Sequence, residues 1–231
     1  MLLTSGSAGG SISTAVLPTI YGRTAAGVAF NGHSTTSTST TTSFGTAYSD
    51  RECWVVIGTM SSLSQAPGGY QVSSVSIGGN AATIVYQTSP PSNTNLQGIA
   101  FARYRDNGSL GTGNVNVTIN YNYIQVHSGF IPYATTNTTS IDDTYQFSGV
   151  STTTSGSITY SGGLAWIVDV KQNSTSSSHP SPWVNDYSFD YGTGEFMTVA
   201  QISGYTPGTY TVAQTSSSTA GTVGIASLAM I

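Results

Sequence analysis

Short stretches in which apolar and polar residues alternate, each ended by turn residues, constrain the fold of this chain most strongly. The clearest is Asn114–Asn120 (NVNVTIN), where Val and Ile alternate with Asn and Thr. A period of two places the apolar side chains on one face of an extended strand. Turn residues separate such stretches, as at Gly78–Asn80 and Asp106–Gly108. No segment combines a helical apolar stripe with a cap, so the sequence predicts an all-β protein.

The predicted strands are spaced along the whole chain at intervals typical of a sandwich. They cover residues 28–30, 34–43, 52–60, 71–77, 81–87, 98–104, 114–120, 123–130, 144–147, 157–160, 164–170, 196–202, 209–213 and 224–230. The pure Ser/Thr tract at 34–43 suits an exposed strand, although its low complexity also fits a loop. This spacing favours an antiparallel, jelly-roll-like β-sandwich.

We predict a single sandwich domain, residues 26–231, whose strands come from both halves of the chain. No strong internal repeat is visible, and the Thr/Asn-rich stretch 134–140 is the best candidate for an internal boundary. Within residues 52–60, apolar side chains occupy both odd and even positions, which predicts a central strand covered on both faces.

Residues 1–25 are rich in Gly, Ser, Thr and Ala and are predicted to form an extended N-terminal arm. Its apolar patch includes Val16, Leu17, Ile20 and Tyr21, which would fix the chain into an assembly; a floppy terminus is the alternative. The first residues lack the basic and apolar regions of a signal peptide, and no apolar stretch approaches about 18 residues. Neither an export signal nor a transmembrane helix is therefore expected.

Charged residues are scarce, at 6% of the chain against about 25% in an ordinary soluble domain. A surface of hydroxyls and amides can lie against a copy of itself because few charges must be desolvated. The chain has 5 Lys and Arg residues in all. They cannot form a basic stripe, so neither nucleic acid nor an anionic membrane is an expected partner.

Groups suited to catalysis are sparse. Cys53 is the single cysteine and lies in an apolar run, so it is predicted to be a buried structural thiol without a disulfide partner. His33, His127 and His179 are far apart in the sequence, and no Gly-x-Ser-x-Gly elbow occurs. We therefore expect no catalytic residue, no cofactor and no resident metal ion.

Aromatic and acidic residues gather after the Ser-rich stretch 172–181. The candidate contact residues there are Trp183, Asn185, Asp186, Tyr187 and Tyr191. Aromatic faces combined with Asn and Asp side chains are typical of sugar-binding modules. The competing interpretation is a loop that tucks its tryptophan into the end of the sandwich.

Two further acidic groups have alternative interpretations. Asp186, Asp190 and Glu195 could form a glycosidase pair or ligate a cation such as Ca²⁺. Asp142–Asp143 could bind a cation or cap a turn.

Four stretches resemble tailed-bacteriophage virion structural proteins of the small β-sandwich type. They are Arg51–Gly58 (RECWVVIG), Val75–Thr83 (VSIGGNAAT), Ile99–Ala102 (IAFA) and Asn114–Thr118 (NVNVT). In those proteins an arginine-led strand precedes an SVTIGGxAAT segment, an aromatic-bearing strand and a VxVT strand. The resemblance covers roughly residues 28–130 in detail and departs at Cys53–Trp54, where small aliphatic residues are more usual. It implies a head decoration, a spike or fibre base, or a tail accessory, and carries no catalytic residues.

These observations predict a non-enzymatic structural component of a virion. Its expected partners are capsid or tail proteins and copies of itself in an oligomer or symmetric array. The alternative is a carbohydrate- or receptor-binding module that contacts a host-surface glycan through the residues around Trp183. A hydrolase that uses the three carboxylates of the same region is the third possibility.

Overall fold

The structure is a computed structural model that describes residues 19–30, 35–60, 71–88, 97–125, 127–150, 153–171, 177–191, 194–215 and 222–231. Sixteen strands and no helix occur in these ranges, which confirms the all-β prediction. All strand ladders between them are antiparallel. In the described part of the chain, no helix is long and apolar enough to cross a membrane.

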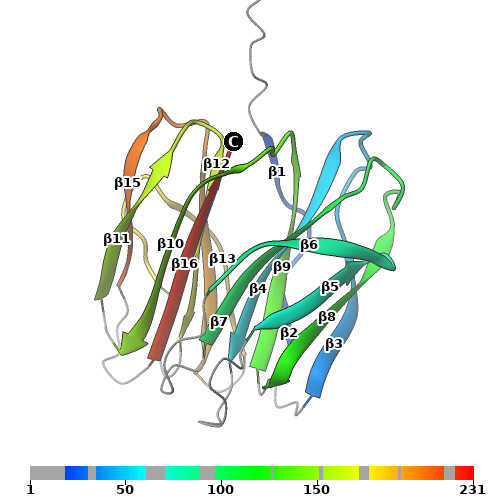
Figure 1. Ribbon diagram of the computed structural model, residues 1–231, viewed down its shortest axis with the longest axis horizontal. Coiled ribbons are helices and arrows are strands. Elements are labelled where there is room, and N and C mark those ends of the chain that lie inside the picture. Colours follow the sequence, from blue (N-terminus) through cyan, green and yellow to red (C-terminus); the bar gives the residue numbers. More distant parts are fainter. Residues whose placement is uncertain are drawn as a thin grey trace, which may run out of the picture.

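The first half of the chain forms a nine-stranded sheet. Its strands are β1 (Thr19–Arg23), β2 (Val28–Phe30), β3 (Thr35–Ser43), β4 (Arg51–Met60), β5 (Val72–Ile77), β6 (Asn80–Gln87), β7 (Gln97–Arg105), β8 (Asn114–Gln125) and β9 (His127–Thr136). They lie in the order β1-β9-β4-β7-β6-β5-β8-β3, and β2 also pairs with β9. The sheet curls on itself, so that β5 and β8 cover one face of β4 and β7 (Figure 1).

The second half forms a five-stranded and a two-stranded sheet. Its strands are β10 (Ile141–Val150), β11 (Thr153–Tyr160), β12 (Leu164–Lys171), β13 (Val184–Asp190), β14 (Phe196–Ser203), β15 (Gly208–Thr215) and β16 (Thr222–Met230). The larger sheet has the order β10-β16-β12-β14-β13, and β11 pairs with β15.

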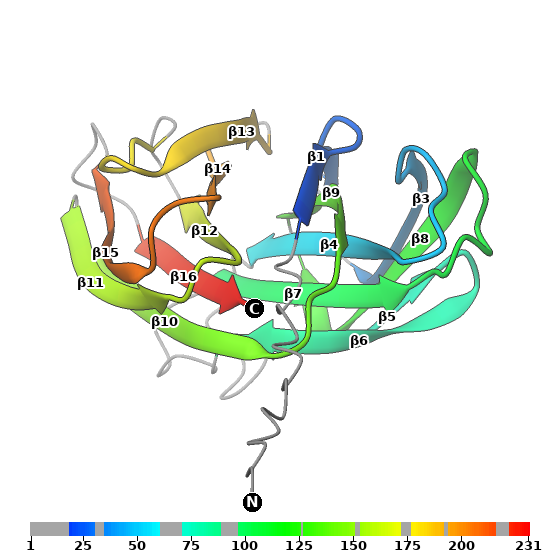
Figure 2. The ribbon, with the colours of Figure 1, turned by 90° about the horizontal axis from the view of Figure 1, so that it is seen from above.

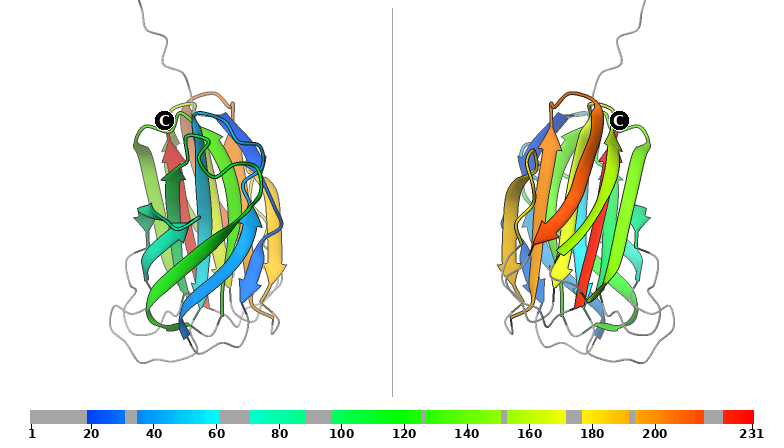
Figure 3. Two further views of the ribbon diagram at one scale, coloured as in Figure 1. Left: turned by 90° about the vertical axis from the view of Figure 1, so that its right-hand side faces the viewer. Right: turned by 90° about the vertical axis from the view of Figure 1, so that its left-hand side faces the viewer.

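These sheets stack as four layers with three hydrophobic cores between them, and Figure 2 shows the layers side by side. The middle core lies between β4, β7 and β9 of the first half and β12, β14 and β16 of the second. The outer cores lie inside each half, one under β5 and β8 and the other under β11 and β15. Most strands of the four layers run in nearly the same direction, as in an aligned sandwich, whereas β5 and β6 cross them obliquely (Figure 1 and Figure 3).

The alternation within β4 explains how one strand serves two cores. Cys53, Val55 and Ile57 belong to the outer core of the first half, whereas Trp54 and Val56 belong to the middle core. All ten residues of β4 are buried, so the predicted coverage of both faces is confirmed.

The two halves follow the same pairing scheme, which the sequence does not display as a repeat. β4 lies between β9 and β7, as β12 lies between β16 and β14. Beyond these strands, β1 and β2 pair with β9 as β10 pairs with β16, and β6 pairs with β7 as β13 pairs with β14. β3 pairs with β8 as β11 pairs with β15. Among the described strands, β5 of the first half has no counterpart in the second.

Two tryptophans occupy corresponding positions and meet in the middle core. Trp54 of β4 pairs with Arg103 and Tyr133, and Trp166 of β12 pairs with Gln201 and Leu228. Their ring centroids lie 5.1 Å apart, so the two halves pack through equivalent surfaces.

The last residues of the predicted N-terminal arm form a strand in the structure. Ile20 and Tyr21 lie in β1, which pairs with β9 of the same chain. Val16 and Leu17 fall outside the described residues. The division into domains and the jelly-roll connectivity stay predictions. The chain passes from one half to the other at residues 137–140, and the middle sandwich takes one sheet from each half.

Candidate functional site

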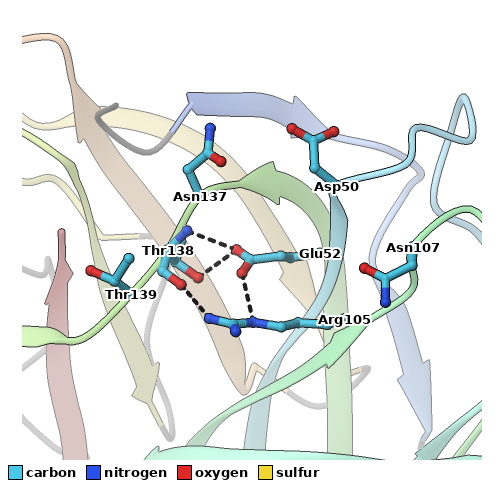
Figure 4. A pocket seen from close by; sticks show the side chains of 7 residues that line it. All are labelled: Asp50, Glu52, Arg105, Asn107, Asn137, Thr138 and Thr139. Atoms are coloured by element: carbon cyan, nitrogen blue, oxygen red, sulfur yellow. Dashed lines mark hydrogen bonds and ion pairs between the residues drawn. The ribbon is translucent and has the colours of Figure 1, made fainter. Parts of the chain in front are cut away.

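A polar pocket of about 270 Å³ lies where the connection between the halves crosses the strand ends of the first half. It is lined by Asp50, Glu52, Arg105, Asn107, Asn137, Thr138 and Thr139 (Figure 4). β4 contributes Glu52, β7 contributes Arg105, and the remaining side chains come from turns next to β4, β7 and β9. All seven lining residues are polar.

Glu52 is the buried centre of this pocket. Its carboxylate accepts hydrogen bonds from the Thr135 hydroxyl at 2.9 Å, from the Thr138 backbone N–H at 3.2 Å and from the Thr138 hydroxyl. Arg105 Nε donates to the same carboxylate at 3.1 Å, and Arg103 Nη1 lies 3.6 Å away. These bonds tie the connection between the halves to the start of β4. Both oxygens of the Glu52 carboxylate already accept hydrogen bonds from the protein itself.

The rim of the pocket carries polar groups that are more open to solvent. Asp50 and Asn107 are exposed, and the side chain of Arg105 is 55% exposed. Asn107 and Asn137 have φ angles of 49° and 59° and are the described non-glycine residues in the left-handed region. Asparagine tolerates this conformation better than most residues. Both strained backbone positions therefore place an amide at the same pocket.

This rim presents a carboxylate, two amides and a guanidinium to a small ligand. Such groups bind the hydroxyl or carboxylate groups of a polar ligand through hydrogen bonds. No aromatic side chain is among the described residues that line the pocket, so a sugar ring would be held by its edge rather than stacked on a face. This site was not predicted from the sequence, although the Asp106–Gly108 turn and the Thr/Asn-rich stretch 134–140 that build it are both visible there.

The tryptophan of the predicted contact segment is buried. Trp183 is 6% exposed, belongs to the outer core of the second half and donates its indole N–H to the Thr211 carbonyl at 2.7 Å. Its ring is therefore covered by neighbouring side chains, which matches the competing interpretation of a tucked tryptophan.

The other four predicted contact residues lie on or beside β13 and point in different directions. Tyr191 is fully buried in the middle core and donates its hydroxyl to the Gly58 carbonyl. Asn185 is exposed, and its amide donates to the Ser177 carbonyl at 3.2 Å. Asp186 and Tyr187 face the first half, where Arg23 contacts both. The structure therefore does not gather these residues with Trp183 on one surface.

Two of the three predicted glycosidase carboxylates contact distant points of β9. Asp186 accepts a hydrogen bond from the Tyr133 hydroxyl at 2.6 Å, and Glu195 lies 2.8 Å from His127 Nε2. Tyr133 and His127 are six residues apart on one strand, roughly 20 Å at the rise of a β-strand. A glycosidase pair needs a separation of about 5 to 10 Å, which Asp186 and Glu195 do not meet. Asp190 is exposed on β13.

Asp142 and Asp143 cap a neighbouring strand. The Asp142 carboxylate accepts from the Ser161 N–H at 2.6 Å, and the Asp143 carboxylate accepts from the Thr159 N–H at 2.7 Å. Of the two interpretations of this pair, the structure favours the cap. In the described ranges, no group of three or more His, Cys, Asp or Glu residues is placed to hold a metal ion.

A second group of buried charges lies inside the second half. Asp169 and Lys171 are fully buried on β12, and His179 Nε2 lies 3.1 Å from Asp169 Oδ2. Burial lowers the pKa of Lys171. Ser177 donates its hydroxyl to Asp169, not to His179. A serine nucleophile needs a histidine as its base, so this set lacks the order of a catalytic triad.

Cys53 is fully buried and free, as predicted. Burial raises the pKa of its thiol to about 12. A thiol that stays protonated is a poor nucleophile and a poor metal ligand.

Comparison with protein-family models, with curated proteins and with solved structures finds no match for this chain.

Proposed function

We propose that this chain is a structural protein that assembles into a tailed-phage virion through an uncharged β surface. The supporting observation is the outer side of β5, β8 and β3. We call this side of the three strands the hydroxyl face. Its side chains are those of Ser37, Ser39, Thr41, Ser74, Ser76, Asn114, Asn116, Thr118 and Asn120. All are exposed or half-exposed, and none is charged.

Hydrogen bonds between neighbouring strands hold the hydroxyl face in order. Ser39 Oγ donates to Asn116 Oδ1 at 2.9 Å and lies 3.0 Å from Thr118 Oγ1. The Asn120 amide donates to Ser74 Oγ at 2.9 Å. Side chains that are already fixed lose little conformational entropy when a partner docks. An ordered, uncharged face of this kind therefore suits repeated contacts in an assembly.

The scarcity of charge on this face lowers the cost of docking because ionised groups are the most expensive to remove from water. The four arginines of the first half lie elsewhere. Arg51 is buried against Asp106, Arg103 and Arg105 lie beside Glu52, and Arg23 lies beside Asp186. Many weak neutral contacts add up when copies are arranged symmetrically.

The virion context rests on the resemblance of four stretches to tailed-phage proteins. Those stretches lie in β4, β5 and β6, β7, and β8, which build the first half and its hydroxyl face. The proposed partners are capsid or tail proteins and further copies of this chain, as a capsid decoration, spike or fibre base, or tail accessory.

Electron microscopy of the purified protein, and of phage particles that carry it, tests this function. We expect a symmetric arrangement with the hydroxyl face at a contact. The variant Ser74→Glu places a charge on this face and should reduce incorporation into particles. The matched control is Ser157→Glu, an exposed serine on β11 of the second half. The proposal would be contradicted by a monodisperse monomer that is found in no phage particle.

A second candidate function is recognition of a polar glycan at the Glu52 pocket. The observation that favours it is the pair of left-handed asparagines, Asn107 and Asn137, at one rim. Asn137→Gly keeps the backbone conformation but removes the amide, so glycan-array binding should be lost. Asn185→Ala removes an exposed amide from the aromatic segment and should leave binding unchanged. The reverse pattern would place the contact near Trp183 instead.

A further inference from the structure

β3 ends the nine-stranded sheet and pairs with β8 on one side. All nine of its residues are Ser or Thr. Few hydrogen bonds engage its other edge. Thr24 Oγ1 donates to the Ser43 carbonyl at 2.8 Å, and the Thr35 hydroxyl bonds the backbone N–H and C=O of Ser37 in the same strand. Within the described ranges, no other strand or side chain is seen to bond the backbone of this outer edge. β3 lies at one extreme of the molecule (Figure 1).

In the corresponding sheet of the second half, other elements of the chain form hydrogen bonds at both edges. Asp142 and Asp143 accept from the backbone N–H groups of Ser161 and Thr159 at the edge of β11. At the edge of β15, Trp183 donates to the Thr211 carbonyl, and Ser178 pairs with Thr215. Because β3 corresponds to β11, β3 is the less protected of these two equivalent edges among the described residues.

Open edges are usually protected, because their unpaired N–H and C=O groups accept another strand. The common protections are charged side chains, proline and bulges. β3 contains no charge and no proline, and its register shift lies at its start, between Thr35 and Ser37. No further shift interrupts the pairing from Ser37 to Ser43, so the backbone of β3 is regular over this range and its outer edge is open between these two residues.

We propose that β3 pairs antiparallel with β3 of a second copy, which joins the sheets of two copies across a two-fold axis. A second copy fits because every register of a pure Ser/Thr strand places a hydroxyl opposite a hydroxyl. Such cross-strand pairs stabilise a sheet, and no like charges oppose each other. The proposal rests on the assembly function above and names one contact of that assembly.

Molar mass in solution, measured by light scattering over a range of concentrations, tests the pairing. The wild-type mass should rise from 23.8 kDa towards twice that value. Ser39→Lys and Ser39→Glu should each stay monomeric, because two like charges near the middle of β3 would lie opposite or diagonal to each other across the axis. Mixing the two variants should restore the doubled mass. The control Ser157→Lys should dimerise like the wild type.

Hydrogen exchange of the unmodified protein gives a second readout that does not depend on any variant. Amides of β3 should exchange more slowly at high than at low concentration, whereas amides of β11 should not change. A constant mass of 23.8 kDa with concentration-independent exchange in β3 would overturn the edge pairing. Dimers that survive both Ser39 variants, or pairing with an unrelated protein alone, would overturn it as well.

The two proposals fail in different ways. If β3 does not pair but Ser74→Glu still abolishes incorporation into particles, the edge pairing is wrong and the assembly function stands. If β3 pairs in solution but no particle carries the protein, the edge pairing stands and the virion function is wrong.

Discussion

At the scale of single residues, charge in this protein serves to hold loops against strands. Arg51 is 1% exposed and donates through Nε to Asp106 at 2.7 Å. Its other nitrogens donate to the Gly45 and Gly111 carbonyls at 3.0 and 2.8 Å. One buried guanidinium therefore fixes the two loops that flank β3 and β8 to the start of β4.

Asp106→Asn tests this role because it leaves the Arg51 charge buried without a counter-ion. Breaking one partner of a buried pair costs about 3–5 kcal/mol, and we expect a loss of unfolding free energy in this range. Urea denaturation measures it. The control Asp50→Asn makes the same chemical change at an exposed site and should alter stability by less than about 0.5 kcal/mol. Equal effects of the two variants would contradict a structural role for the buried pair.

Cys53 offers a pH-dependent probe of folding at the same scale. Its pKa rises from 9.0 to about 12 because burial disfavours the thiolate. The unfolded thiol ionises first, so this group contributes stability below pH 9 that is lost progressively as the pH rises towards 12. At a pH of about 9.5, a disulfide reagent should label one thiol per chain in urea and none in the native protein. Rapid labelling of the native protein would contradict the buried position.

At the scale of elements, the alternation in each strand explains which side chains meet. Tyr187 and Phe189 of β13 lie at alternate positions and pack against the glycines of the first half. A Cβ atom at Gly129 would lie 2.6 Å from Phe189 Cζ and 2.7 Å from the Val28 carbonyl oxygen. The absence of a side chain at Gly129 therefore lets β13 approach β2 and β9.

Gly129→Ala should lower the free energy of unfolding by about 1–3 kcal/mol, because the methyl group has no room. Thermal and urea unfolding measure this loss. Gly113→Ala is the matched control, since a Cβ atom there meets nothing within 4 Å and its φ is not in the left-handed region. A loss as large at Gly113 as at Gly129 would contradict close packing as the cause, because Gly→Ala at an open, unstrained site lowers the entropy of the unfolded chain and should not destabilise the fold.

At the scale of the whole molecule, the two halves share one core. Trp166 packs against Trp54, Phe101 and Tyr133, with ring centroids 5.1, 6.1 and 5.6 Å away. The middle core takes apolar residues from β4 and β7 as well as from β12 and β14. Each half alone would expose this surface to water, so we expect the halves to unfold together.

Trp166→Ala should cost about 3–5 kcal/mol and should speed hydrogen exchange in β4 and β7 as well as in β12. Ile158→Ala is the comparison, because Ile158 lies in the outer core of the second half. That variant should speed exchange mainly in β11 and β15. If Trp166→Ala changed exchange in the second half alone, the halves would be independent folding units.

The sequence by itself determined the fold class, the position of most strands and the buried state of Cys53. These properties follow from local patterns: alternation assigns side chains to two faces, and turn residues end each strand. Two predicted strands match the structure within a residue at each limit. The Ser/Thr tract at 34–43 forms β3, and residues 52–60, with apolar side chains on both faces, form β4.

Only the tertiary structure decided which faces meet and which residues share a site. Asp50, Arg105 and Asn137 come together because β4 pairs with both β7 and β9, and such long-range pairing leaves no local signal. The sequence left Trp183 open to a ligand contact or a core position, and only its packing in the fold decided between them. The shared pairing scheme of the halves was hidden for the same reason, since a strand's period fixes its faces but not its neighbours.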